Sequence, residues 1–64
     1  MRDSMPLEAG ERVVLALLGP EPRHVDELCR AASLPVADVT ASLAMLELKG
    51  LARQVGSKTY VTAG

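Results

Sequence analysis

Aromatic side chains are almost absent from this sequence, which has one tyrosine and no phenylalanine or tryptophan. The hydrophobic core must therefore be built from Leu, Val, Ala and Met side chains. A surface on which the bases of single-stranded nucleic acid stack normally offers several aromatic rings. Tyr60 alone gives little support for such a surface, and we expect its ring edge to close the core instead.

Cysteine and histidine occur once each, as Cys29 and His24. A single cysteine excludes an internal disulfide framework, and one Cys with one His cannot supply the four ligands of a structural zinc site. The glycines are isolated at predicted helix and turn ends, so no Gly-rich phosphate loop is present. We expect Cys29 to be a small core residue and His24 to lie on the surface at a strand end. The sequence predicts no enzyme activity, no metal site and no cofactor.

A surplus of basic charge is also missing, since the net charge is −1. Proteins dedicated to duplex DNA usually carry a basic surplus on one face. The longest apolar run, residues 13–18, is too short to cross a bilayer. The chain does not open on a basic and apolar leader, and a lone cysteine suits a reducing compartment. We therefore expect a cytoplasmic protein without a membrane segment.

What the sequence does contain is typical of one small globular domain, with 48% hydrophobic and 23% charged residues among 64. Residues 1–7 mix charge and proline without a period, so we expect a flexible tail or linker there. The folded domain is expected over residues 8–64.

The first elements predicted along that domain are a helix ending near Gly19, a short extended piece over 23–25, and a helix with Asp26 as N-cap. A long helix follows, from Pro35 to a left-handed Gly50. The last element is a hairpin of 51–55 and 58–62 that turns at Gly56 and Ser57. This order is that of a winged helix-turn-helix. The predicted fold is mainly α with a small β-hairpin, which means three helices and a wing sheet of two to three strands.

The long helix has two apolar sides. At 100° per residue, one side carries the expected core residues Val36, Val39, Leu43 and Leu46. The opposite side carries mostly small apolar residues, namely Ala37, Thr40, Ala41, Ala44 and Leu48. A helix that reads bases in the major groove needs Arg, Lys, Asn or Gln at such positions. Three interpretations stay open: a solvated helix rich in alanine, a surface for another protein, and base readout, which the residues support least.

The first helix shows the same excess of apolar residues. Val14, Leu15 and Leu18 suffice for a core stripe. Val13 and Leu17 are left without a place in it, and a helix that is apolar nearly all round usually has a second partner. The predicted protein interface consists of Val13, Leu17, Ala37, Ala41, Ala44, Met45 and Leu48.

Positive charge gathers in the hairpin, because residues 51–64 carry Arg53 and Lys58 and no acid. One interpretation is a wing that touches phosphates, and the other is ordinary polar decoration of an edge strand. The predicted phosphate contacts are Lys49, Arg53, Lys58, Thr40 and Ser42. So few contacts predict weak DNA binding that ignores base sequence.

Four segments, "GPEP", "HVDEL", "LPVADV" and "MLELKGLARQ", resemble in order and spacing the C-terminal winged-helix domain of the DNA-processing protein A (DprA) family. The resemblance covers the chain from about Leu7 onward. It implies a bacterial, cytoplasmic parent protein that protects incoming single-stranded DNA in natural transformation and helps to load the RecA recombinase. It also implies a preceding Rossmann-like domain with the main single-strand site, and a winged helix that is a non-catalytic accessory.

The sequence departs from that family in two places. Ser33 stands where the family often has glycine between two helices, which predicts a slightly strained turn. Residues 8–10 replace the usual helix start, which predicts fraying of the first helix. The partners implied are the upstream Rossmann-like domain, a second copy, RecA and weakly bound DNA. The alternative function, a free-standing winged-helix transcription regulator, needs a basic reading helix and usually a dimerising extension, and the sequence shows neither.

Overall fold

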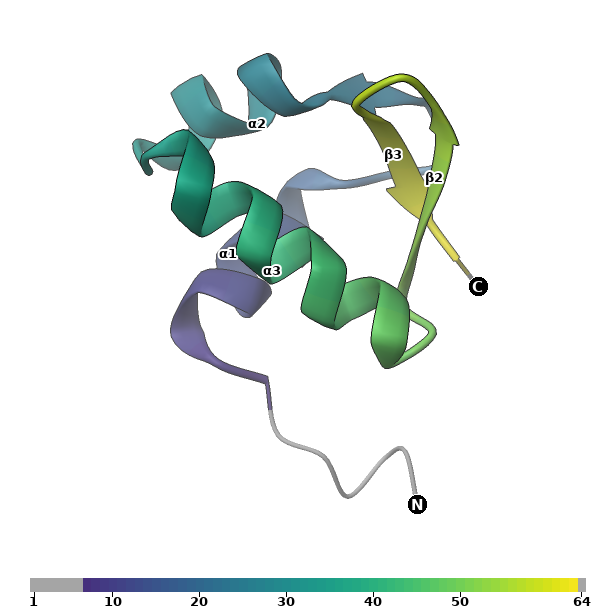
Figure 1. Ribbon diagram of the computed structural model, residues 1–64, viewed down its shortest axis with the longest axis horizontal. Coiled ribbons are helices and arrows are strands. Elements are labelled where there is room, and N and C mark those ends of the chain that lie inside the picture. The colour runs from purple at the N-terminus through teal and green to yellow at the C-terminus, as the bar shows by residue number, and fades with distance from the viewer. Residues whose placement is uncertain (1–6, 64) are drawn as a thin grey trace.

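Three helices and three short strands form the described part of the protein, residues 7–63 of a computed structural model. In chain order they are α1 (Ala9–Leu17), β1 (Arg23–His24), α2 (Val25–Ala32), α3 (Val36–Leu48), β2 (Ala52–Gly56) and β3 (Thr59–Thr62). The strands make one antiparallel sheet in which β3 lies between β1 and β2. Figure 1 shows the helices packed together and the β2–β3 hairpin turning back from the end of α3 toward β1. The structure confirms the predicted winged helix-turn-helix.

The core lies between the helices and is built from aliphatic side chains. Its fully buried members are Val14, Leu28, Val39, Leu43 and Leu46. Tyr60 packs against them while staying partly exposed, and burial together with the negative charge of Glu47 raises the pKa of its hydroxyl above 10.0. Leu7, which the sequence places in the tail, also packs against the core, and the rest of that tail lies outside the described residues.

One residue of the predicted core stripe lies outside the core. Val36 is 56% exposed, whereas Val39, Leu43 and Leu46 are fully buried. Val36 is the first residue of α3, and the buried part of the stripe begins one turn later. Assigning Val36 to the core was wrong, because periodicity gives the direction of a side chain around the helix but not how far along it the neighbouring elements extend.

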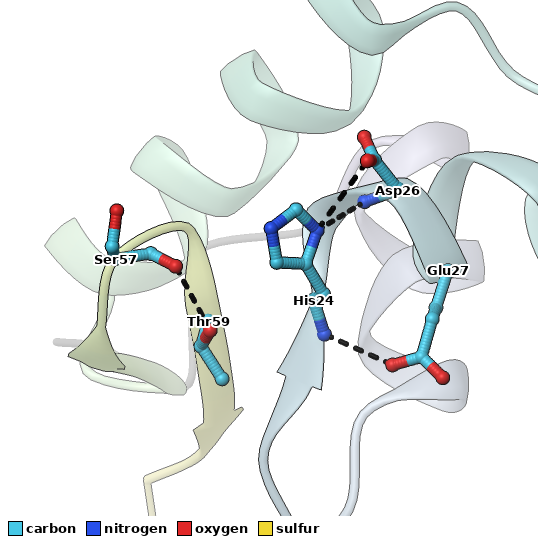
Figure 2. Close-up of polar contacts among 5 residues, drawn as sticks. All are labelled: His24, Asp26, Glu27, Ser57 and Thr59. Carbon is cyan, nitrogen blue, oxygen red and sulfur yellow. Dashed lines mark hydrogen bonds and ion pairs between the residues drawn. The ribbon is translucent and has the colours of Figure 1, made fainter.

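The helix α2 begins at a cap supplied by His24, the last residue of β1. Its Nδ1 accepts a hydrogen bond from the N–H of Asp26 at 3.0 Å, and its own N–H donates to Oε1 of Glu27 at 3.1 Å (Figure 2). The prediction of Asp26 as N-cap was wrong by two residues, because an imidazole nitrogen can accept the bond that a short polar side chain usually accepts. Asp26 and Glu27 instead occupy the first turn, where negative charge stabilises a helix.

The turns on either side of α3 both use left-handed backbone. Ser33, at the end of α2, has φ 56° and ψ 41°. Gly50, just after α3, has φ 76°. The N–H groups of Gly50 and Leu51 donate to the carbonyls of Glu47 at 3.0 Å and Leu46 at 2.8 Å, which are the two bonds of a Schellman motif. The predicted stop at Gly50 is confirmed.

The wing turns one residue later than predicted. Gly56 still pairs with Thr59, so Ser57 and Lys58 form the tip, and Lys58 has a left-handed φ of 54°. The hydroxyl of Thr59 donates to the carbonyl of Ser57 at 2.9 Å (Figure 2). A register shift lies between Gln54 and Gly56. Placing Gly56 and Ser57 at the centre of the turn was wrong, because the bulge puts an extra residue in β2 that turn propensity does not show.

Candidate protein and nucleic-acid interfaces

Lys49, one of the predicted phosphate contacts, lies inside the molecule. It is 7% exposed, and its Nζ lies 2.5 Å from Oε1 of Glu11. The same Oε1 accepts the N–H of Glu8 at 3.3 Å, so the ion pair joins the start of α1 to the end of α3. If this ammonium turned outward to a phosphate, it would leave a buried carboxylate without its charge partner. The structure therefore uses Lys49 to hold α1 against α3.

Glu11 is the residue of this region that sequence reasoning missed. The hydrogen bond from Lys49 lowers the pKa of Glu11 below 4.5, burial of the carboxyl opposes this, and the Glu8 N–H and the positive charge of Lys49 lower it further. No local pattern links Glu11 to a residue 38 positions away. The spacing of Glu8 and Glu11 is that of a capping box, however, and could have marked a helix start. The structure begins α1 at Ala9, within the segment predicted to fray.

The two residues whose hydroxyl groups were predicted to contact phosphate lie in different places, Thr40 bonded within α3 and Ser42 beside α1. The Thr40 hydroxyl donates back to the carbonyls of Val36 at 2.9 Å and Ala37 at 3.1 Å. Ser42 is half-buried beside α1, so that a Cβ on Gly10 would lie 3.2 Å from the Ser42 Oγ. Arg53 and Lys58 are thus the predicted phosphate contacts whose side chains the structure leaves exposed on the wing.

The side of α3 that faces away from the core forms a continuous exposed surface, the α3 outer surface. Its residues are Ala37, Thr40, Ala41, Ala44, Met45 and Leu48. Leu48 is 81% exposed and Met45 is 40% exposed, so two large apolar side chains lie among small neighbours on this surface. Contiguous apolar patches of this kind often mark interaction sites. The charged residues that flank this surface are the exposed acids Asp38 and Glu47. The part of α3 that would enter a DNA groove therefore carries negative flanks and no exposed cation.

The two residues of α1 that were predicted to lie in a protein interface have different environments. Val13 is 43% exposed on the side of the helix turned away from the core. Leu17 is half-buried and packs against the core cluster. Val13 can therefore meet a partner directly, whereas much of Leu17 already contributes to the fold.

A groove of about 420 Å³ runs between the start of α1 and the neighbouring side of α3, and we name it the α1–α3 groove. Its lining residues are Glu8, Gly10, Glu11, Leu34, Asp38, Ala41, Ser42 and Met45. Three of these eight are acids and none is basic. Ala41 and Met45 also belong to the α3 outer surface, so the groove and that surface are continuous.

The wing presents charge of the opposite sign. The three strands and the turn between β2 and β3 contain Arg23, Arg53 and Lys58 and no acid. All three basic side chains are exposed. Val55, between Arg53 and the tip, is 45% exposed and gives this surface an apolar side chain.

Residues 7–63 contain no group of three or more His, Cys, Asp or Glu side chains that could hold a metal ion. Over the same residues, no single helix has the length and apolar character needed to cross a membrane. The helices α2 and α3 meet those two criteria only when taken together, across a bend of 111°. Cys29 is half-buried and packs against the core.

These features define a winged-helix domain in which the helix usually used to read DNA has an apolar outer surface. The family model described as the DprA winged helix domain matches residues 1–58, and the chain belongs to that family. The match confirms the resemblance that the sequence motifs indicated, and the family is not a catalytic one. No curated protein matches the chain.

Proposed function

We propose that this domain is a non-catalytic accessory module of a DNA-processing protein and acts mainly by contact with polypeptide. The α3 outer surface carries the proposal, because its exposed Leu48 and small neighbours are suited to cover by apolar side chains. Phosphates and base edges are bound chiefly by Arg, Lys, Asn and Gln, which this surface lacks. Family membership supports the wider role, which is protection of single-stranded DNA in the cytoplasm during natural transformation and loading of RecA.

The polypeptides proposed as partners are the upstream Rossmann-like domain of the parent protein, a second copy of the domain, and RecA. Alanine at 37, 41 and 44 lets a partner backbone approach α3 closely, and Leu48 gives the contact a large apolar side chain. Val13 of α1 adds a second apolar contact.

The wing gives the domain a secondary nucleic-acid contact. Arg53 and Lys58 are exposed and can approach a phosphate backbone, but two cations give weak binding without base selection. A free-standing transcription regulator needs a basic reading helix, and α3 contains no lysine or arginine. The module is therefore proposed to assist DNA processing and not to select a DNA sequence.

Titration of ¹⁵N-labelled protein with a single-stranded and a duplex oligonucleotide tests this proposal. We expect small chemical-shift changes at Arg53 and Lys58 and none at Ala37, Ala41 or Ala44. The Arg53→Ala/Lys58→Ala variant should lose even these changes. In a second titration, the purified upstream domain should perturb the α3 outer surface, and Leu48→Glu should weaken that response. Micromolar oligonucleotide binding with its largest shifts at the three alanines would overturn the proposal.

A further inference from the structure

We propose that the wing of one copy of this chain docks in the α1–α3 groove of a second copy, head to tail. The inference rests on the proposed function and deepens it, since it names one polypeptide that contacts Ala41 and Met45, which the groove shares with the α3 outer surface. The wing and the groove carry opposite charge, which favours a second copy of the chain as this partner.

The groove attracts a cationic and apolar segment. Asp38 is exposed, and among residues 7–63 its carboxylate has no hydrogen-bond or ion-pair partner. Glu8 adds a second exposed acid to the lining, whereas the charge of Glu11 is already balanced by Lys49. Met45 supplies a flexible apolar wall that can adapt to a partner side chain.

The wing offers the matching chemistry. Arg53 and Lys58 are exposed, and neither side chain has an ion-pair partner within the described part of the chain. Val55 lies between them and is 45% exposed. Two acids that border the sheet are engaged by backbone, because Glu47 accepts the N–H of Gln54 at 3.2 Å and Glu27 accepts that of His24 at 3.1 Å. The third, Asp26, lies 3.7 Å from the His24 ring.

The wing cannot reach the groove of its own chain. Asp38 lies in the first turn of α3 and β2 follows the end of that helix, whose 13 residues span about 20 Å. Figure 1 shows the hairpin and the start of α1 on opposite sides of the molecule. The complementary surfaces can therefore meet only between two copies, and a contact between unlike patches is heterologous, so it extends to further copies unless it closes into a ring.

Size and charge set the strength of this contact. With a net charge of −1, two copies repel each other little, so the local attraction between wing and groove can act. A hairpin tip in a groove covers far less than the roughly 800 Å² per partner of a stable interface. Association is therefore weak, with a dissociation constant in the high-micromolar range or above, and salt weakens it further because the charges are exposed.

Sedimentation equilibrium and NMR dilution series test the inference, with a reductant that keeps the Cys29 thiol free. At about 0.05 M salt, the wild type should associate with shifts at both Lys58 and Asp38, and about 0.5 M salt should weaken this severalfold. Asp38→Lys and Lys58→Glu should each abolish association, and the milder Asp38→Asn should reduce it. An equimolar mixture of the two charge-reversed proteins should associate again, because the unaltered wing of Asp38→Lys can dock in the unaltered groove of Lys58→Glu.

Matched controls carry the same charge changes elsewhere. Glu21→Lys and Arg30→Glu lie on exposed positions outside the wing and the groove, and both should associate like the wild type. Thermal melts confirm that each variant is folded. A wild type that stays monomeric at millimolar concentration in low salt overturns the inference, as does a mixture that fails to restore association. Neither result touches the proposed function, which the oligonucleotide and upstream-domain titrations decide separately.

Discussion

At the scale of single residues, Ser33 holds a conformation that costs stability. A non-glycine residue in the left-handed region loses roughly 1 kcal/mol relative to glycine, because its Cβ crowds the following carbonyl oxygen. Ser33 has φ 56° at the end of α2. We predict that Ser33→Gly raises the free energy of unfolding by about 1 kcal/mol, which is ~4–8 °C in melting temperature for a domain of this size. Thermal unfolding followed by circular dichroism measures it.

Gly50→Ala is the matched control for that substitution. Gly50 has φ 76°, so a Cβ there should lower stability by a similar amount. If Ser33→Gly instead lowers the melting temperature while Gly50→Ala behaves as expected, then the Ser33 side chain contributes more than its backbone costs, and the argument from strain fails.

Single residues also show where sequence reasoning succeeds. The left-handed Gly50 was predicted correctly because such a turn depends on the residue that occupies it and on its immediate neighbours, whereas strain at Ser33 was expected only because the resembling family often has glycine there. His24 as a cap and Lys49 as a buried ion were not predicted. Glu27 has the capping-box spacing to His24, but histidine is not a usual N-cap residue, and the partner of Lys49 is 38 residues away.

At the scale of elements, the Glu11–Lys49 pair is the polar contact that holds α1 to α3. Removing one member leaves the other charged and buried, which is strongly unfavourable, whereas replacing both with apolar residues of similar size leaves neither charge buried. We predict that Glu11→Leu and Lys49→Met each lower the denaturation midpoint in urea, and that the double variant recovers part of the loss. A double variant that is no more stable than either single variant would contradict this prediction. It would show that the pair stabilises the fold by more than neutralising two buried charges.

The pH dependence of stability reports on the same pair. The folded-state pKa of Glu11 is lowered from 4.5, so the carboxylate stabilises the fold above about pH 4.5 and this contribution is lost as the pH falls through the lower folded-state value. In Lys49→Met the two lowering effects of Lys49 disappear and burial dominates. The sign should then reverse, with Glu11 favouring the fold as acid protonates it. Urea midpoints of the wild type and of Lys49→Met are measured between about pH 3 and about pH 7. The other carboxyl groups contribute equally to both proteins, so the difference between the two midpoints reports on Glu11.

Elements were easier to predict than the surfaces they carry. The order of helices and strands follows from hydrophobic period, Pro35 and Gly50, all of which act locally. The wing tip shifted by one residue because a bulge in β2 depends on its pairing with β3. The α1–α3 groove could not be predicted, since its acids come from Glu8, Glu11 and Asp38 on two helices that meet only after folding.

At the scale of the whole molecule, the charges separate into acidic helices and a basic wing, and this separation determines how nucleic acid can bind. Of the predicted phosphate contacts, Arg53 and Lys58 stay exposed on the wing, while Lys49 is buried. Two phosphate contacts predict a slope of about −1.8 for log affinity against log salt with duplex DNA and about −1.4 with a single strand. A contribution from Lys49 would make the duplex slope about −2.7.

Fluorescence anisotropy over a series of salt concentrations measures that slope. Arg53→Ala should reduce the magnitude of the slope by about 0.9 on duplex DNA. The variant makes one phosphate contact fewer, and binding therefore releases about one counterion fewer. Thr40→Val should leave both affinity and slope unchanged, since the Thr40 hydroxyl donates to the carbonyls of Val36 and Ala37 within α3. A wild-type slope near −2.7, together with a lower affinity of Thr40→Val, would mean that α3 approaches the duplex and that Lys49 leaves Glu11 to meet a phosphate. A slope near −1.8 that depends on Arg53 and Lys58 alone leaves the α3 outer surface available to polypeptide while the wing holds DNA.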